Sequence, residues 1–258
     1  MIQRHIVLLL TLFFALPTSA TLSAQTLPET AGHDHSVLRL NVATGGYPPY
    51  TIIDEGGAVS GIMWDVMSAI AKAHNLALDA REIPTKRVDD FLLSGQLDAT
   101  MRALEWSTQP EQFVFSDSVL KVQDVIFTQA DNPLQVNEIE DLAGGTLLAR
   151  FGYHYPTLEP YFDTGEITRL NVPDAQSMFQ RLHSADRFDG LVSDLRSGRW
   201  LIQVHGWDDK FKVEPLIIDE TDFRFMFAPE WAPFVEGFNQ TLQAMRESGE
   251  FDAIVAKY

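Results

Sequence analysis

Cysteine is absent from this chain of 258 residues, and that absence excludes disulfides, thiolate metal sites and a lipid-anchored cysteine. Long apolar runs are equally scarce, because the most continuous one, residues 6–15, is about half of the ~20 residues that a membrane helix needs. Positive charge is also sparse, with 19 Lys and Arg against 36 Asp and Glu. The net charge of −17 disfavours nucleic acid and anionic lipid as partners.

The N-terminus has the layout of a secretory signal peptide. A basic start at residues 1–5 precedes the apolar run, and small residues follow around Ala20 and Ala24. We therefore expect a signal peptide over residues 1–24, cleaved after residue 20 or 24, and a flexible leader over residues 25–36. The sequence predicts a periplasmic protein.

Two segments share a helix–strand pattern. Residues 91–117 begin as the end of an amphipathic helix, stop at Ser94-Gly95, and continue into a short strand over 97–102 and a polar loop. Residues 178–194 repeat the order and end at Asp194. Because open α/β sheets bind ligands at strand ends, the repeat predicts two similar lobes that face one another across a cleft.

The order of the elements predicts the division of the chain. Strands and helices alternate after residue 133, which indicates mostly parallel sheets. We expect lobe 1 at residues 37–129 plus 224–258 and lobe 2 at residues 130–223. Two crossings, near Ala130 and Phe223, would join them. The predicted elements include strands over 124–130, 146–150, 211–218 and 223–228 and a helix over 195–204. A last long helix, with Phe234, Phe238, Leu242 and Met245 at helical spacing as core residues, should end near Gly249.

Several residues are candidates for ligand contact. Tyr47 and Tyr50 lie on a rigid turn with Gly and Pro, where their rings either stack on a ligand or pack internally. At a predicted strand-to-helix step, Gly152, Tyr153 and His154 offer backbone N–H groups to an anion. No cofactor motif and no thiolate metal site is found, so we expect no cofactor and no metal.

A series of motifs resembles the periplasmic solute-binding proteins of the amino-acid type, family 3. The carriers, in chain order, are Tyr47-Pro48-Pro49-Tyr50, Gly61 to Asp65, Ser94 to Asp98, Phe115-Ser116-Asp117, Asp141 to Gly144, Phe151-Gly152, Phe188 to Asp194, and Ser248-Gly249 with Lys257-Tyr258. The resemblance covers nearly the whole mature chain.

The resemblance implies a fold, a site and a partner. The fold is the two-lobed α/β type II fold of periplasmic binding proteins, which closes on a small solute and delivers it to a membrane ABC transporter permease. Tyr47 matches the ring that stacks on the solute, Gly152 and Tyr153 match the turn that holds its carboxylate, and Asp194 matches the acid that takes its ammonium. We expect a monomer.

The sequence departs from the family at the carboxylate anchor. The family has Thr and, three residues later, Arg before the Phe-Ser step, whereas this chain has Trp106 and Gln109. Gln cannot replace the charged fork of a guanidinium. We hypothesise that Arg102, with Arg87 in support, supplies the anchor; the alternative is that Arg102 pairs with Glu105 or Asp98. Trp106 would narrow the pocket or add a stacking face.

Two other functions remain open. A sensor would present the same module to a membrane receptor rather than to a transporter. An enzyme of the dehydratase type would use Glu105 and His154 as general acid and base. Binding without chemistry is the favoured interpretation, because the sequence holds none of the common catalytic motifs.

Overall fold

The structure is a computed structural model that describes residues 36–185 and 187–258. The predicted signal peptide and nearly all of the predicted leader lie outside the described residues. Within the described residues, no helix is long and apolar enough to cross a membrane.

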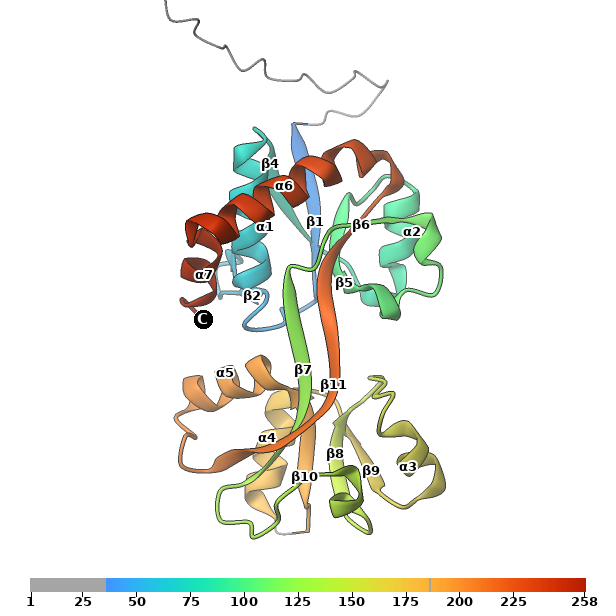
Figure 1. Ribbon diagram of the computed structural model, residues 1–258, viewed down its shortest axis with the longest axis vertical. Coiled ribbons are helices and arrows are strands. Elements are labelled where there is room, and N and C mark those ends of the chain that lie inside the picture. The colour runs from blue at the N-terminus through green and yellow to red at the C-terminus, as the bar shows by residue number, and fades with distance from the viewer. Residues whose placement is uncertain (1–35, 186) are drawn as a thin grey trace, which may run out of the picture. The chain divides into compact units, whose positions relative to one another are not determined.

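Figure 1 shows the strands and helices of the described chain. The strands are β1 (Val37–Val42), β2 (Ile52–Ile53), β3 (Val59–Ser60), β4 (Ala77–Glu82), β5 (Ala99–Ala103), β6 (Val114–Phe115), β7 (Leu120–Gln129), β8 (Thr146–Arg150), β9 (Thr168–Val172), β10 (Gly190–Asp194) and β11 (Phe211–Phe227). The α-helices are α1 (Ile62–Ala73), α2 (Val88–Leu93), α3 (Glu159–Thr164), α4 (Ala175–Ser184), α5 (Leu195–His205), α6 (Ala232–Ser248) and α7 (Glu250–Val255). The 3-10 turns are η1 (Thr85–Arg87), η2 (Leu104–Trp106), η3 (Pro110–Gln112), η4 (Ile139–Leu142) and η5 (Pro229–Trp231).

The main sheet consists of two parallel groups joined by two long antiparallel strands. Its order is β4-β1-β5-β11-β7-β10-β8-β9, and β6 adds to β11. The groups β4-β1-β5 and β10-β8-β9 are parallel, whereas β11 pairs antiparallel with both β5 and β7. The strands β7 and β11 thus run side by side between the two groups (Figure 1). This arrangement confirms the predicted two-lobed α/β class.

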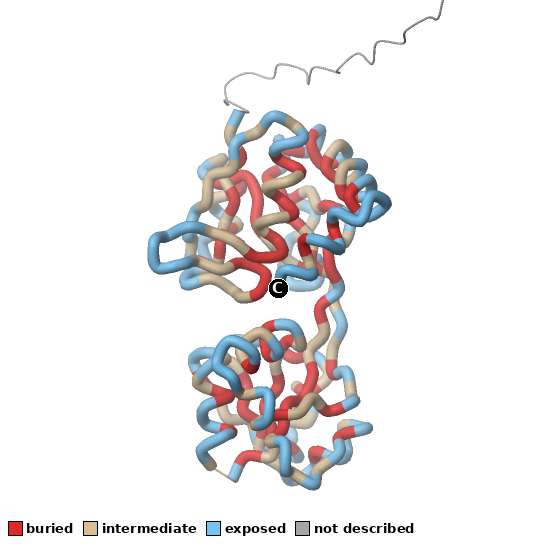
Figure 2. Tube along the Cα trace, turned by 90° about the vertical axis from the view of Figure 1, so that its left-hand side faces the viewer, coloured by how far each residue is buried: buried red, intermediate tan, exposed pale blue. Residues whose placement is uncertain are grey.

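The apolar core is divided in the same way. One cluster draws its buried residues from 38–122 and 223–254, and two others draw theirs from 125–218. Buried segments alternate with exposed turns along both parts of the trace (Figure 2). The predicted lobe boundaries at 129/130 and 223/224 stay a prediction.

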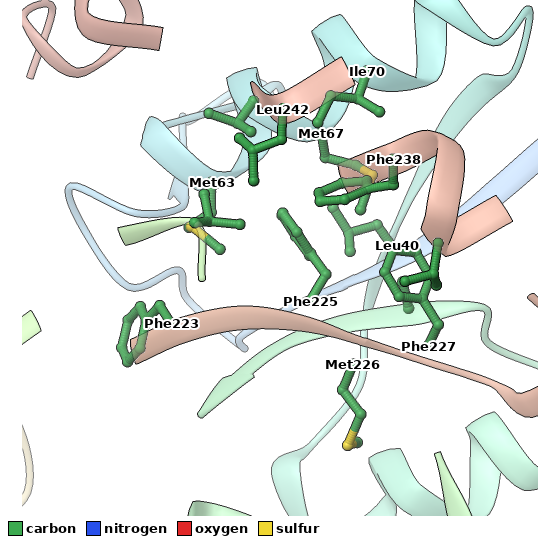
Figure 3. Packing of buried hydrophobic residues seen from close by; sticks show 14 of the residues in the cluster. Leu40, Met63, Met67, Ile70, Phe223, Phe225, Met226, Phe227, Phe238 and Leu242 are labelled. Carbon is green, nitrogen blue, oxygen red and sulfur yellow. The ribbon is translucent and has the colours of Figure 1, made fainter. Parts of the chain in front are cut away.

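Strand β11 carries much of the first core. Phe225 and Phe227 point to the same side as Phe238 of α6, while Met226 points to the opposite side (Figure 3). Successive side chains of a strand face opposite sides of the sheet, so β11 contributes buried side chains to both faces. The aromatic residues of α6 are core residues, as the helical spacing predicts.

Most predicted elements agree with the structure to within a few residues, and two predictions were wrong. The sequence suggested separate strands over 211–218 and from Phe223, but β11 is continuous over Phe211–Phe227. The polar residues between them, which resemble a loop, pair with β7 in the ladder. Strand β7 begins at Leu120, four residues before the predicted start at Asp124.

The two predicted helix–strand units also share a hydrogen bond made by an aspartate just before each strand. Asp98, just before β5, accepts a hydrogen bond from the backbone N–H of Arg39 on β1 at 2.6 Å. Asp189, just before β10, accepts one from the backbone N–H of Thr146 on β8 at 2.7 Å. Each aspartate fixes its strand to the neighbouring parallel strand.

Candidate functional site

The site is centred on Asp194, where β10 ends and α5 begins. One carboxylate oxygen, Oδ1, accepts hydrogen bonds from the Tyr50 hydroxyl and from the Ser197 backbone N–H, each at 2.8 Å. The bond from Ser197 caps the N-terminus of α5, where a carboxylate is favoured by the helix dipole. The other oxygen, Oδ2, is buried and has no hydrogen-bond partner among the described residues.

Tyr50 brings the turn after β1 to this aspartate. Its side chain is fully buried, and burial together with the charge of Asp194 raises the pKa of its hydroxyl well above the usual range. The Ser197 hydroxyl donates to the Pro48 carbonyl at 2.6 Å, so two hydrogen bonds connect the turn to the start of α5. The predicted residues Tyr50 and Asp194 therefore lie in direct contact.

Two more aspartates lie beside Asp194 on neighbouring strands. Asp124 of β7 is the register partner of Asp194 on β10 and also of Asp219 on β11. Burial, followed by the charges of Asp194 and Asp219, raises the pKa of Asp124 to about 7. Asp219 accepts a hydrogen bond from the Thr157 hydroxyl at 2.6 Å through Oδ1, and its Oδ2 is buried without a partner among the described residues.

Aromatic rings line the same region. The ring centroid of Tyr47 lies 5.2 Å from that of Tyr50 and 6.3 Å from that of Phe223. The Trp106 ring meets Phe223 edge-on at 5.2 Å and is 53% exposed. The ring centroid of Tyr153 lies 6.5 Å from that of Tyr155. The negative faces of such rings favour a cation.

The tyrosines are electrostatically coupled to the aspartates. Burial raises the pKa of Tyr47 first, and the charge of Asp194 raises it further. The pKa of Tyr155 is raised by burial and then by Asp124. These effects place the hydroxyl groups of both rings within the electrostatic reach of the aspartates.

Arg150, the last residue of β8, was not among the predicted site residues. Its guanidinium lies 4.6 Å from the ring centroid of Tyr153 and 5.9 Å from that of Tyr47. None of the ion pairs within the described residues involves Arg150. Its position at the end of a predicted strand, next to Phe151-Gly152, is the feature of the sequence that could have identified it as a site residue.

The predicted arginines contact other residues. Arg102 of β5 pairs with Asp89 at 2.7 Å, and neither Glu105 nor Asp98 is its partner. Asp98 instead pairs with Arg39 at 2.6 Å. Arg87 is exposed, with its guanidinium 4.8 Å from the centre of the Phe91 ring.

The polar residues after β8 and β5 have local partners. Gly152 has a positive φ of 78° in the turn that carries Tyr153. His154 is 74% exposed and lies 3.2 Å from Glu159. Glu105 accepts a hydrogen bond from the Thr221 hydroxyl at 3.3 Å, and Gln109 accepts one from Gln112 at 2.7 Å. In the described part of the chain, no group of His, Asp and Glu is arranged to hold a metal ion.

Comparison with known proteins agrees with this fold. The model of the bacterial extracellular solute-binding proteins, family 3, matches residues 40–258, so the chain belongs to that family of solute-binding proteins. The predicted resemblance is thereby confirmed.

Two relatives and one solved structure show the range of similar proteins. The chain is 22% identical over 226 residues to a probable amino-acid-binding protein, YxeM, of Bacillus subtilis (strain 168), covering 87% of this chain and 84% of that one. It is 26% identical over 223 residues to a probable histidine-binding protein of Neisseria gonorrhoeae, covering 82% and 79%. A histidine kinase sensor domain with similarity to periplasmic binding proteins shares the fold, with a TM-score of 0.70, 21% identity, and coverage of 87% and 96%.

Proposed function

We propose that the protein binds a small solute with an ammonium group, an amino acid or a related amine, in the periplasm. Closure of the two lobes would hold the solute for delivery to an ABC transporter. The observation that carries this proposal is the buried Oδ2 of Asp194, which has no hydrogen-bond partner among the described residues. Leaving a buried carboxylate oxygen unpaired costs free energy, and an ammonium group supplies the missing donors.

The carboxylate of an amino acid needs a cationic partner, and Arg150 is the better candidate. The guanidinium of Arg102 is already paired with Asp89, and only 11% of its side chain is exposed. Arg150 instead lies against Tyr47 and Tyr153, two of the predicted ligand-binding rings. We therefore assign the carboxylate contact to Arg150, supported by the N–H groups of the Gly152 turn.

Thermal unfolding and calorimetry of the mature protein against a panel of amino acids, small carboxylates, polyamines and sugars test the proposal. A solute at a hundred times its dissociation constant should add about 2.7 kcal/mol to the free energy of unfolding. In Asp194→Asn, Oδ1 can still cap α5, so the fold should persist while affinity falls at least about a hundredfold. Asp163→Asn, an exposed site on α3 with the same charge change, is the control.

A second pair of variants tests the carboxylate contact. Arg150→Ala should weaken the binding of an amino acid at least about tenfold, because a charge-assisted hydrogen bond is lost. Arg102→Ala should stay within about twofold. The opposite ranking would return the anchor to Arg102.

The likeness to a histidine kinase sensor domain favours one alternative, a sensor that presents the bound solute to a membrane receptor. Uptake of labelled solute by cells that lack the gene separates the two roles, since a transport protein is required for uptake and a sensor is not. We propose no catalytic step, because Glu105 and His154 each contact a different neighbour. N-terminal sequencing of the periplasmic protein should find a start at Thr21 or Gln25.

A further inference from the structure

The proposed contacts with the ammonium and carboxylate groups of a simple amino acid give Asp124 no role. It lies on β7 directly opposite Asp194 of β10 and Asp219 of β11. Residues directly opposite in antiparallel strands have side chains on one face, with Cα atoms roughly 4.5–5.5 Å apart. Like charges in such positions are destabilising, so three neighbouring carboxylates need a compensating group.

The surroundings do not supply enough positive charge. None of the ion pairs within the described residues involves Asp124, Asp194 or Asp219. The remaining groups that face the cluster are hydroxyl groups and rings: Tyr47 and Tyr50 from the turn after β1, Tyr153 and Tyr155 from the loop after β8, and Thr157. The exposed Arg196 is the cation whose charge acts on Asp194, while Arg150 lies against the rings of Tyr47 and Tyr153.

The unpaired oxygens point to a ligand rather than to a structural network. Oδ2 of Asp194 and Oδ2 of Asp219 are both buried without a partner among the described residues, and Asp194 is only 6% exposed. An α-ammonium group on Asp194 and a carboxylate on Arg150 would leave Asp124 and Asp219 uncompensated. A second positive group on the solute would compensate them.

We propose that Asp124, Asp194 and Asp219 form one site for positive charge, and that the solute is a small amine with a net positive charge, such as a diamino acid or a diamine. This inference rests on the proposed function for the place of the solute.

Binding at this site is coupled to a proton. Burial, Asp194 and Asp219 together raise the pKa of Asp124 to about 7, so below that pH the empty site holds a proton. A cationic solute must displace it. Affinity for such a solute should rise as the pH increases from about 6 to about 8, and level off above that.

Isothermal titration of the mature protein with three probes tests the inference. L-ornithine carries both amino-acid groups and a second ammonium group, L-norvaline lacks the second ammonium, and 1,4-diaminobutane lacks the carboxylate. We expect ornithine to bind at least about tenfold tighter than norvaline. Asp124→Asn should abolish most of that ratio by weakening ornithine much more than norvaline, whereas Asp163→Asn should change the affinity for neither.

The outcomes separate this inference from the proposed function. Equal affinity for ornithine and norvaline would overturn the inference and keep the proposed function. Binding of the diamine alone would keep the inference and remove the carboxylate contact at Arg150. If Asp124→Asn weakened norvaline as strongly as ornithine, or if none of the three bound, the assignment of Asp124 to a second cation would be wrong.

The pH dependence gives an independent readout. Ornithine affinity should be several-fold lower at about pH 6 than at about pH 8, and this difference should disappear in Asp124→Asn. Circular dichroism of each variant at both values confirms that the fold is intact. A pH effect that persists in Asp124→Asn would overturn the assignment of the proton to Asp124.

Discussion

The two helix–strand units of the chain begin alike and end differently. At the start of β5 and β10, Asp98 and Asp189 each bind the backbone of the neighbouring parallel strand. At the ends, Arg102 of β5 is paired with Asp89, whereas Asp194 of β10 keeps one buried oxygen without a partner among the described residues. The comparison teaches that residue type alone does not distinguish a structural aspartate from one proposed to bind the solute, whereas the completeness of its hydrogen bonding does.

The largest effect should come from a structural aspartate. Asp98 accepts hydrogen bonds from Arg39 at 2.6 and 2.8 Å and from the Trp231 indole at 3.1 Å, and it is 2% exposed. Asp98→Ala removes the carboxylate that pairs with the partly buried Arg39 guanidinium, so we expect a loss of about 3 kcal/mol in the free energy of unfolding. Denaturation in urea measures it.

The matched variant in the other unit is Asp189→Ala. Among the described residues, the side chain of this aspartate accepts one backbone hydrogen bond, from Thr146, so the loss should be about 1 kcal/mol. Equal losses in the two variants would contradict the interpretation that the number of hydrogen bonds decides the difference.

The next prediction concerns Asp124 in the candidate site, where a substitution should raise the free energy of unfolding rather than lower it. The pKa of Asp124 is about 7 in the folded chain, above the unfolded value of 3.8, so the folded state binds its proton more tightly. Folding is therefore opposed by this group as the pH rises from about 4 to about 7. The full shift corresponds to about 4 kcal/mol. Because a buried Asn amide still carries part of the cost of burial, Asp124→Asn should raise the free energy of unfolding of the ligand-free protein by roughly 2 kcal/mol at pH 8 and by much less at pH 4.

Thermal unfolding at the two pH values measures this gain, with Asp163→Asn as the control for charge. A gain of the same size at both pH values would show that packing, and not the titration of Asp124, separates the variant from the native chain.

The smallest effect tests the contact between Tyr50 and Asp194. Tyr50→Phe removes the hydroxyl that donates to Oδ1, and we expect a loss of about 1 kcal/mol in the free energy of unfolding. Tyr161→Phe removes a hydroxyl that donates to Glu140 at 3.1 Å at the surface, and should cost less than about 0.5 kcal/mol. Equal losses in the free energy of unfolding would show that the buried hydrogen bond of Tyr50 stabilises the fold no more than the surface hydrogen bond of Tyr161.

The sequence predicted the fold well because its signals are local. Helix α5 and strand β8 follow from apolar spacing, and α6 ends at Ser248, where Gly249 caps it with a positive φ. Strand β11 was divided in the prediction because its central residues are polar. They stay in the ladder because β7 supplies the hydrogen-bond partners, and periodicity carries no information about a partner strand.

The site was predicted only in part, for the same reason. Tyr50 and Asp194 were named separately, and their contact spans 144 positions of sequence. Asp124 and Arg150 lie at the ends of predicted strands, but their role depends on which side chains the register places beside them. The resemblance predicted which residues would face the solute, whereas the neighbours of each charge came only from the structure.

The irregular pairing of β11 has a mechanical consequence. The register between β11 and β7 shifts between Val213 and Ile217 and again between Ile217 and Asp219, directly beside Asp124. Bulges of this kind bend a strand locally. We expect this segment to act as the fulcrum of a lever, because a small rotation there displaces distant residues in proportion to their distance from it. A solute that neutralises the aspartates would then bind directly beside the segment about which β11 bends.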